Sequence, residues 1–301
     1  MKIKTIAKVS IFAIVAGFIF TGIGYSFNKN TFLENTKTDK SFAISSGKYE
    51  SESLTLESFK NINIVSDLNN IEIIPGDEYK LDLKYKKDYI NVEYKIENET
   101  LSITENKVKS ETYNLEDYKN NKDNSIKIYI PKNIQINNLS IASNVSNLYL
   151  NGISINKLDL SCDTGNININ NCKSDQSNIL TATGSIGVEH LDGLTAKFES
   201  NMGNINIANS SIKETLELSN NLGHTKFQGE LLGNINVSNN LGNIELDINN
   251  KDKEYNYNLK TDSGKIIIND ETKNKKFTKD NGSKFNIKLE CNSGNINLRI
   301  K

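Results

Sequence analysis

Apolar and polar residues alternate along the chain from about residue 54, as in FKNINIV, YKLDLKY and IKIYI. A period of two places successive side chains on opposite faces of a strand, so these segments predict half-buried β-strands. Pro75 and Pro131 each end one such run, because proline cannot donate a hydrogen bond to a neighbouring strand. The pattern of the leading region, 54–132, therefore predicts a meander of β-strands.

From about residue 133 the alternation becomes an internal repeat centred on a glycine. Each unit is a short strand, small polar residues, a glycine usually followed by asparagine, and a second strand, as in CDTGNINI and SNMGNINI. The first five glycines follow one another at a nearly constant spacing, and two looser copies follow. The repeat glycines are Gly165, Gly184, Gly203, Gly223, Gly242, Gly264 and Gly294. Two earlier copies are SNVSNLYL, with Ser146 in the glycine place, and SDLNNIEI at residues 66–73.

Apolar residues recur five places before each glycine and two and four places after it, as Ile179, Ile186 and Val188 do around Gly184. Thr225 is the one polar exception in these columns. A unit of two short strands cannot bury its apolar face alone, whereas stacked units cover one another. The sequence therefore predicts an all-β fold. Residues 133–301 are expected to form a single-chain, parallel β-helix-like solenoid with coils of about 19 residues and strands in register.

The repeat positions carry a structural interpretation. Glycine is expected where the chain turns sharply with a positive φ angle. The asparagines that follow it are expected to stack into a ladder of side-chain amides, which His224 interrupts and Ser185 and Lys265 vary. The ladder residues are Asn147, Asn166, Asn204, Asn243 and Asn295. Calcium-binding nonapeptide repeats need aspartate at a nine-residue period, so no metal and no cofactor is predicted here.

Residues 1–27 predict an N-terminal membrane anchor. Lys2, Lys4 and Lys8 precede an apolar run from Val9 to about Tyr25, which is about long enough to cross a bilayer. The basic flank is expected in the cytoplasm, so the chain would be a single-pass protein of the cell membrane with its bulk extracytoplasmic. A cleaved signal peptide is the alternative, but no small-x-small site follows the run. The polar residues 28–53 predict a linker.

Charge and side-chain chemistry exclude several classes of function. With 36 basic and 37 acidic residues the net charge is −1, which gives no reason to expect nucleic acid as a partner. Hydrolysis of glycosides needs paired carboxyl groups, and the column of Asp163 continues with neutral residues. His190 and His224 each lack a second ligand at metal-binding spacing. The chain is therefore expected not to be an enzyme, and no catalytic residue is predicted.

The three cysteines are Cys162, Cys172 and Cys291. Cys162 and Cys291 share a column, but coils stacked at strand spacing would hold them too far apart for a disulfide. A bond between Cys162 and Cys172 within one coil stays open. Because the number of cysteines is odd, at least one thiol is expected to be free.

The leading FKNINIVSDLNNIEIIPG, the strand that ends at Pro131 and the S-x-x-G-N-I-x-I units resemble a bacterial cell-envelope family known as "putative adhesin", a domain of unknown function with β-strand repeats. The likeness covers about Ser58 to Ile300. It implies an exported, membrane-anchored β-solenoid without established catalytic residues. Proteins that look like this are often linked with envelope stress responses, so the resemblance also implies a sensory or regulatory role as an alternative.

Two functions follow as expectations. The first is a non-catalytic cell-surface adhesin or interaction module, whose long polar face would contact a cell-wall glycan or an envelope protein. The alternative is an accessory sensor or regulator of envelope stress, which would act through a membrane partner because only eight residues precede the apolar run. An aromatic contact patch is expected in the leading region, formed by Tyr49, Tyr79, Tyr85, Tyr89 and Tyr94.

Overall fold

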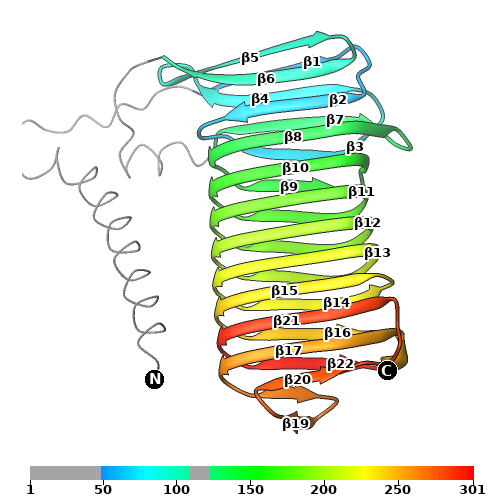
Figure 1. Cartoon of the computed structure of the whole chain (residues 1–301). Coiled ribbons are helices and arrows are strands. Elements are labelled where there is room, and N and C mark those ends of the chain that lie inside the picture. The colour runs from blue at the N-terminus through cyan, green and yellow to red at the C-terminus, as the bar shows by residue number, and fades with distance from the viewer. Residues whose placement is uncertain (1–48, 109–122) are drawn as a thin grey trace, which may run out of the picture. The chain divides into compact units, whose positions relative to one another are not determined.

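A computed structural model describes residues 49–108 and 123–301, and these residues form one compact unit of stacked β-strands (Figure 1). Their only helical element is the 3-10 turn η1 (Asp252–Glu254), so the predicted all-β class is confirmed. In this part of the chain no helix is both long and apolar enough to cross a membrane. The anchor predicted at 1–27 and most of the linker predicted at 28–53 lie outside the described residues.

Apart from the segment between β6 and β7, the strands follow one another with short connections. In chain order they are β1 (Tyr49–Thr55), β2 (Asn61–Ser66), β3 (Asn70–Gly76), β4 (Lys80–Lys86), β5 (Ile90–Glu97), β6 (Thr100–Lys107), β7 (Ser125–Pro131), β8 (Gln135–Val145), β9 (Leu148–Asn151), β10 (Ser154–Thr164), β11 (Ile167–Thr183), β12 (Ile186–Met202), β13 (Ile205–Leu222), β14 (Thr225–Leu231), β15 (Asn234–Leu241), β16 (Ile244–Ile248), β17 (Tyr255–Ser263), β18 (Ile266–Ile268), β19 (Glu271–Lys273), β20 (Lys276–Lys279), β21 (Phe285–Ser293) and β22 (Ile296–Ile300).

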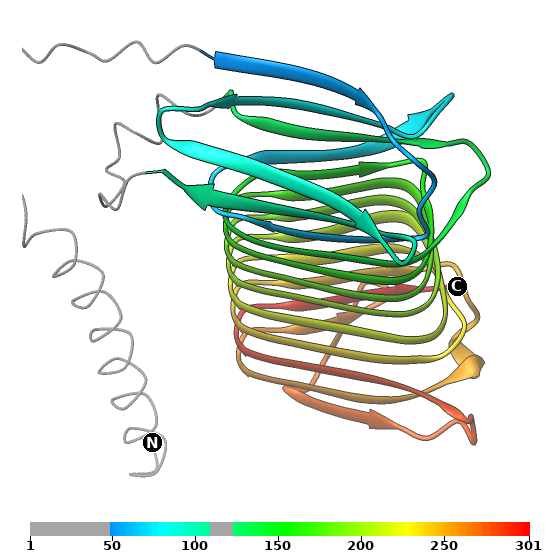
Figure 2. The same cartoon turned by 90° about the horizontal axis from the view of Figure 1, so that it is seen from above.

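The strands stack into two walls, and the coils superpose when the stack is seen from above (Figure 2). The first wall, which follows the repeat glycine, runs β1, β4, β7, β3, β9, the first parts of β11, β12 and β13, and then β14, β16, β22, β18 and β19. The second wall, which precedes the glycine, runs β5, β6, β2, β8, β10, the later parts of β11, β12 and β13, and then β15, β21, β17 and β20.

The core lies between the walls and consists of the predicted apolar columns. Ile205 pairs with Ile186 in the coil before it and with Thr225 in the coil after it, all in parallel register. Residues of the three columns are buried along the whole stack, from Ile141 to Ile296. Thr225 is fully buried too, and its hydroxyl donates to Asn239 Oδ1 at 2.7 Å, which satisfies its polar group. The predicted parallel, in-register solenoid is therefore confirmed.

The leading region differs from the predicted meander. β2 and β3 pair in parallel with β8 and β9, and β6 and β7 lie on β2 and β3 in the same way. The segment 66–73 thus lies in a coil of the solenoid formed by β2 and β3, with Ser66 opposite Ser143 and Ile71 opposite Leu148. Alternation shows that a segment is a strand, but not the direction of its partner. The described residues therefore have no domain boundary at 132/133.

The linker also ends earlier than its predicted limit at residue 53. β1 begins at Tyr49 and pairs antiparallel with β4 along its whole length. Its sequence YESESLT places polar side chains on both faces, which explains why alternation did not reveal it. A strand at the end of a stack needs no second apolar face.

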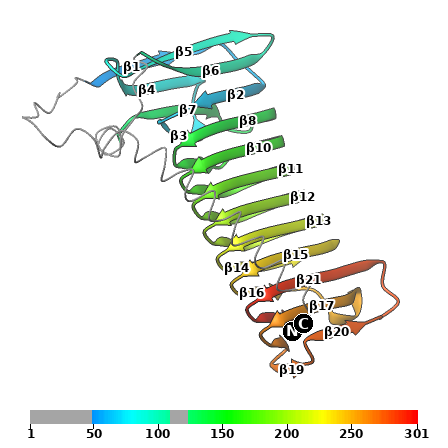
Figure 3. The ribbon, with the colours of Figure 1, turned by 60° about the vertical axis from the view of Figure 1, so that its left-hand side comes forward.

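The two looser copies at the C-terminus stack in reversed order. β21 and β22, the last strands of the chain, lie between β15 and β16 on one side and β17 and β18 on the other (Figures 1 and 3). After β16 the chain therefore passes over one empty level, forms the outermost coil, and returns to fill that level. The wider spacing of Gly242, Gly264 and Gly294 along the sequence leaves room for this return.

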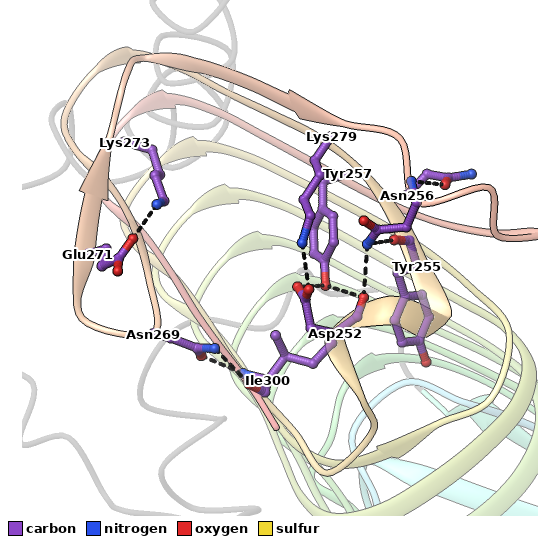
Figure 4. Close-up of polar contacts among 10 residues, drawn as sticks. Asp252, Tyr255, Asn256, Tyr257, Asn269, Glu271, Lys273, Lys279 and Ile300 are labelled. Carbon is purple, nitrogen blue, oxygen red and sulfur yellow. Dashed lines mark hydrogen bonds and ion pairs between the residues drawn. The ribbon is translucent and has the colours of Figure 1, made fainter.

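Polar contacts hold the crossover in place (Figure 4). The hydroxyl of Tyr257 donates to Asp252 Oδ1 at 2.7 Å, and Lys279 Nζ lies 2.5 Å from Asp252 Oδ2. Near the chain end, Asn269 Nδ2 donates to the carbonyl of Ile300 at 2.8 Å, while the amide of Ile300 donates to Asn269 Oδ1 at 2.9 Å. These bonds tie η1, the outermost coil and the last strand together.

Antiparallel strands close both ends of both walls. β1 and β5 are the outermost strands at the N-terminal end, and β19 and β20 are outermost at the other. All four carry charged side chains, such as Glu50 and Glu52 in β1 and Lys276 and Lys279 in β20. Charged edges discourage further strands from adding to an exposed sheet, so the stack has a defined length.

Candidate functional site

The repeat glycines form one edge of the solenoid, where the chain turns from the second wall to the first. All seven have positive φ angles, between 128° and 154°. A Cβ placed on any of them would lie only 1.8 to 2.1 Å from the carbonyl oxygen of the residue at the same position of an adjacent coil. For Gly203 that oxygen belongs to Gly184. Glycine is needed here both for its backbone conformation and because the next turn leaves no space for a side chain.

The small polar residues three places before each glycine satisfy the carbonyls of this edge. Ser200 Oγ donates to the carbonyl of Gly184 at 3.2 Å, and Asn220 Nδ2 donates to that of Gly203 at 2.9 Å. Cys162 and Cys291 occupy the same column, and their thiols donate to the stacked carbonyls of Ser146 and Gly242 at 3.2 Å. Burial raises the pKa of these thiols and of Cys172, and all three cysteines are free in the structure.

The five ladder asparagines also stack on this edge, but their bonding differs from a chain of amides. Each side-chain oxygen accepts the backbone N–H of the next coil, as Asn147 Oδ1 does from Asn166 at 3.1 Å and Asn243 Oδ1 from Asn295 at 2.9 Å. Asn166, Asn204 and Asn295 do the same for Ser185, His224 and Lys265 of the next coil in the stack. The column is therefore a series of side-chain caps on exposed backbone donors.

His224 was expected to interrupt the ladder, and this expectation is wrong. Its Nδ1 accepts the N–H of Asn243 at 3.1 Å, so the ring supplies the same acceptor as an asparagine. Ser185 Oγ likewise accepts the N–H of Asn204 at 3.3 Å. Lys265 offers no acceptor, and beyond its coil the stack continues with the antiparallel strand β19 instead of another repeat turn.

A second corner, six residues after the glycine, was not recognised from the sequence. Its residues have left-handed φ angles between 49° and 67° and are Gly152, Asn171, His190 and Asn209. The signal was present, because asparagine and glycine tolerate this conformation better than other residues. His190 is thus a corner residue, with Nδ1 3.8 Å from Glu189 Oε1. Within residues 49–108 and 123–301, no group of three or more His, Cys, Asp or Glu side chains could hold a metal ion.

The outer side of the second wall carries a true amide ladder, two places before the glycine. Asn221 Nδ2 donates to Asn201 Oδ1 at 2.8 Å, Asn240 Nδ2 to Asn221 Oδ1 at 2.9 Å, and Asn292 Nδ2 to Asn240 Oδ1 at 2.7 Å. We call these four asparagines, with Ser219 and Ser238 beside them, the amide face. It lines a shallow depression of about 400 Å³.

A second depression, of about 380 Å³, adjoins the amide face. Charged residues of both signs line it: Lys197 lies 2.6 Å from Glu199, and Lys288 lies 3.5 Å from Glu290. Glu217 lies opposite Lys197 on the neighbouring strand. The hydrogen bond to Glu199 raises the pKa of Lys197, so this lysine stays charged. The surface therefore combines neutral hydrogen-bonding groups with interspersed charges of both signs.

Of the five tyrosines expected to form an aromatic patch, four are buried or half-buried. Tyr85 is only 3% exposed, and Tyr79 stacks edge-on against the buried Phe59 with ring centroids 4.7 Å apart. The ring of Tyr49 lies beneath Lys84 Nζ at 4.9 Å, and Tyr89 packs against the core. Tyr94 alone among the five is an exposed side chain. Most of these tyrosines therefore pack against neighbouring strands and do not form an exposed contact patch.

Comparison with known proteins identifies relatives of this architecture. The model of the family described as Toastrack DUF4097 matches residues 59–299. A solved "putative adhesin" from Bacteroides fragilis is 16% identical, with a TM-score of 0.50, over 84% of this chain and 97% of that chain. A "putative adhesin" from Parabacteroides distasonis is 10% identical, with a TM-score of 0.43, over 84% of this chain and 98% of that chain. No curated protein matched. At so low an identity the Bacteroides likeness concerns the fold alone.

The close approach at the glycine edge predicts the effect of adding one methyl group. Gly203→Ala is expected to lower the free energy of unfolding by about 2 kcal/mol or more, because Cβ would overlap the carbonyl of Gly184 and the φ angle of 147° is strained for alanine. Urea denaturation measures this. The control is Gly187→Ala, in extended backbone, where Cβ would meet only the side chain of Asn168 at 3.0 Å. Equal stability of the two variants would contradict the assignment.

The ladder predicts that stability depends on whether the side chain at position 224 offers a hydrogen-bond acceptor, and not on which residue supplies it. His224→Asn retains an acceptor and is expected to change the free energy of unfolding by less than about 0.5 kcal/mol. His224→Leu leaves the N–H of Asn243 without its partner and should cost about 0.5 to 1.5 kcal/mol. Lys265→Leu, in the same column but without an acceptor to lose, is the control and should be neutral. A loss at Lys265 equal to that at His224 would refute the capping role.

Proposed function

Because this chain belongs to the Toastrack DUF4097 family, a β-repeat domain of unknown function, we propose its function from the surface that the repeat builds. The protein is a non-catalytic cell-surface interaction module, and its amide face binds a linear polymer such as a cell-wall glycan. Residues 1–27 anchor it in the cell membrane with the solenoid on the extracytoplasmic side. The proposal involves no cofactor, no nucleic acid and no catalytic step.

The observation that carries the proposal is the regular chain of asparagines on the outer side of the second wall. Each interior amide uses one N–H and one oxygen lone pair within the ladder, which leaves one N–H and one lone pair for a ligand. Neighbouring coils repeat this pair of groups at strand spacing, about 4.8 Å. A polymer with regularly spaced hydroxyl and amide groups can satisfy several such pairs at once.

Charge balance favours an uncharged ligand backbone. The lysines beside the amide face are paired with glutamates, and the whole chain has a net charge of −1. Such a surface attracts neither strong polyanions nor strong polycations over a distance. Short-range hydrogen bonds must then supply the selectivity, and many weak identical contacts along one polymer add up by avidity.

The proposal predicts loss of polymer binding when two adjacent rungs are removed. Asn221→Ala with Asn240→Ala should reduce binding of the full-length chain to isolated insoluble cell-wall sacculi by about tenfold or more, since each lost hydrogen bond is worth about 1 kcal/mol. Co-sedimentation over a range of protein concentrations gives the apparent dissociation constant, and sacculi stripped of protein separate glycan from protein ligands.

The matched control removes two outward asparagines from the first wall, Asn168→Ala with Asn206→Ala. Both side chains are exposed and lie on parallel strands, as the rungs of the amide face do. The control variant should bind the sacculi as the unmodified chain does. Equal losses in both variants, or no sedimentation of the unmodified chain, would exclude glycan binding by the amide face.

The proposed topology has its own test. Protease added to intact cells should cut the chain after Asn28 while residues 1–27 stay with the membrane fraction, because the basic flank holds the N-terminus in the cytoplasm. Tags placed at each end and followed by immunoblotting report this, and an intact cytoplasmic protein confirms that the cells were not broken. A soluble mature protein that lacks residues 1–27 would show cleavage instead of anchoring.

A further inference from the structure

A group of buried polar residues lies on the turn edge at the N-terminal end of the stack. The register pairs Asn70 with Ser125 and Val65 with Thr104. Asn124 therefore lies over Asn69 in the glycine column, and Glu105 lies over Ser66 in the small polar column. Asn69 and Asn124 are 0% exposed and Glu105 is 9% exposed. We call Asn69, Glu105 and Asn124 the upper turn cluster.

One oxygen of Glu105 has a structural role in this cluster. Its Oε2 accepts hydrogen bonds from Ser66 Oγ at 2.6 Å, from Asn69 Nδ2 at 2.8 Å, and from the backbone N–H groups of Asp67 and Leu68 at 2.8 and 3.0 Å. The carboxylate therefore caps the turn at residues 66–69. It acts there as the ladder side chains do on lower coils.

The remaining polar atoms of the cluster have no partner. Glu105 Oε1, Asn69 Oδ1, and both Oδ1 and Nδ2 of Asn124 are buried without a hydrogen bond. No lysine or arginine among the described residues forms an ion pair with Glu105. A buried carboxylate without a neighbouring positive charge is costly, and buried carbonyl oxygens without donors add to that cost. Capping of the turn accounts for the position of Glu105 Oε2, but it gives no role to the four unpartnered atoms.

We propose that the upper turn cluster is a binding site for a calcium ion, with Glu105 Oε1, Asn69 Oδ1 and Asn124 Oδ1 as protein ligands. Oxygen atoms of carboxylates and carboxamides are the ligands of hard cations, whereas zinc, copper and nickel favour nitrogen and sulfur. Because both atoms of the Asn124 amide are unpartnered, its oxygen is free to turn toward the ion.

The ligand set also indicates the strength of binding. One carboxylate and two neutral amides supply a single negative charge, so the affinity belongs to the range of extracellular modules, about 10⁻⁴ to 10⁻³ M. Mg²⁺ is less suited, because it demands a near-ideal octahedron and keeps most of its water. A buried water molecule is the rival occupant. It could donate to two of the oxygens, but it would leave the charge of Glu105 uncompensated.

The test combines thermal unfolding and direct binding on the full-length chain. CaCl₂ at about 10 mM should raise the Tm by about 2 to 6 °C over NaCl of equal ionic strength, and MgCl₂ should raise it less. Equilibrium dialysis should show one Ca²⁺ bound per chain. If Ca²⁺ neither binds nor shifts the Tm, the proposal is wrong.

Two variants locate the ion. Asn124→Ala leaves all four bonds to Glu105 Oε2 intact, so it should fold with an unchanged Tm in EDTA and lose the Ca²⁺ response. Glu105→Gln removes the charge but keeps the shape, and it should lose Ca²⁺ binding as well. The exposed Asn206→Ala is the control and should bind as the unmodified chain does. Unaltered Ca²⁺ binding by Asn124→Ala would overturn the assignment even if the protein binds calcium elsewhere.

Discussion

The close contact between successive turns is the constraint on which the rest of the solenoid depends. The backbone of each repeat turn lies in close contact with a carbonyl of the adjacent turn. A Cβ at Gly184 or Gly203 would lie 1.9 Å from that oxygen. This contact fixes the level at which each coil begins. Once the level is fixed, residues at equal distances from the glycine must stack, and the core columns, the capped carbonyls and the ladders all follow from that register.

The same register explains which polar groups each turn needs. Backbone donors and acceptors at an edge have no strand partner, and buried ones must find another. The column of Ser200 and Asn220 supplies donors for the carbonyls, and the column of Asn204 and His224 supplies acceptors for the amides. Where the glycine is absent, as at Asn69 and Ser146, the residue does not have a positive φ angle. Those turns use side chains such as Glu105 to close.

The strong repeat made the middle of the fold predictable, because glycines at a nearly constant spacing leave one consistent stacking. The ends were not predictable for a physical reason: there the partners are distant in sequence. Ile71 pairs with Leu148 although several other strands lie between them along the chain, and β21 returns to pair with β15. Nothing in local alternation records such pairings. The capping role of His224 was equally hidden, because an acceptor is recognised only when the N–H of Asn243 is placed beside it.

The candidate surface shows a further consequence of stacking. An asparagine on an isolated strand would hydrogen-bond to water in many orientations, but a neighbour at the same position of the next coil holds its amide in one plane. Asn221 and Asn240 are held in this way from both sides. Their remaining donors and acceptors are thus ordered before any ligand arrives, which lowers the entropy lost on binding. The number of ordered rungs is set by the number of coils, so the affinity of the amide face for a polymer should grow with the length of the repeat rather than with any single residue.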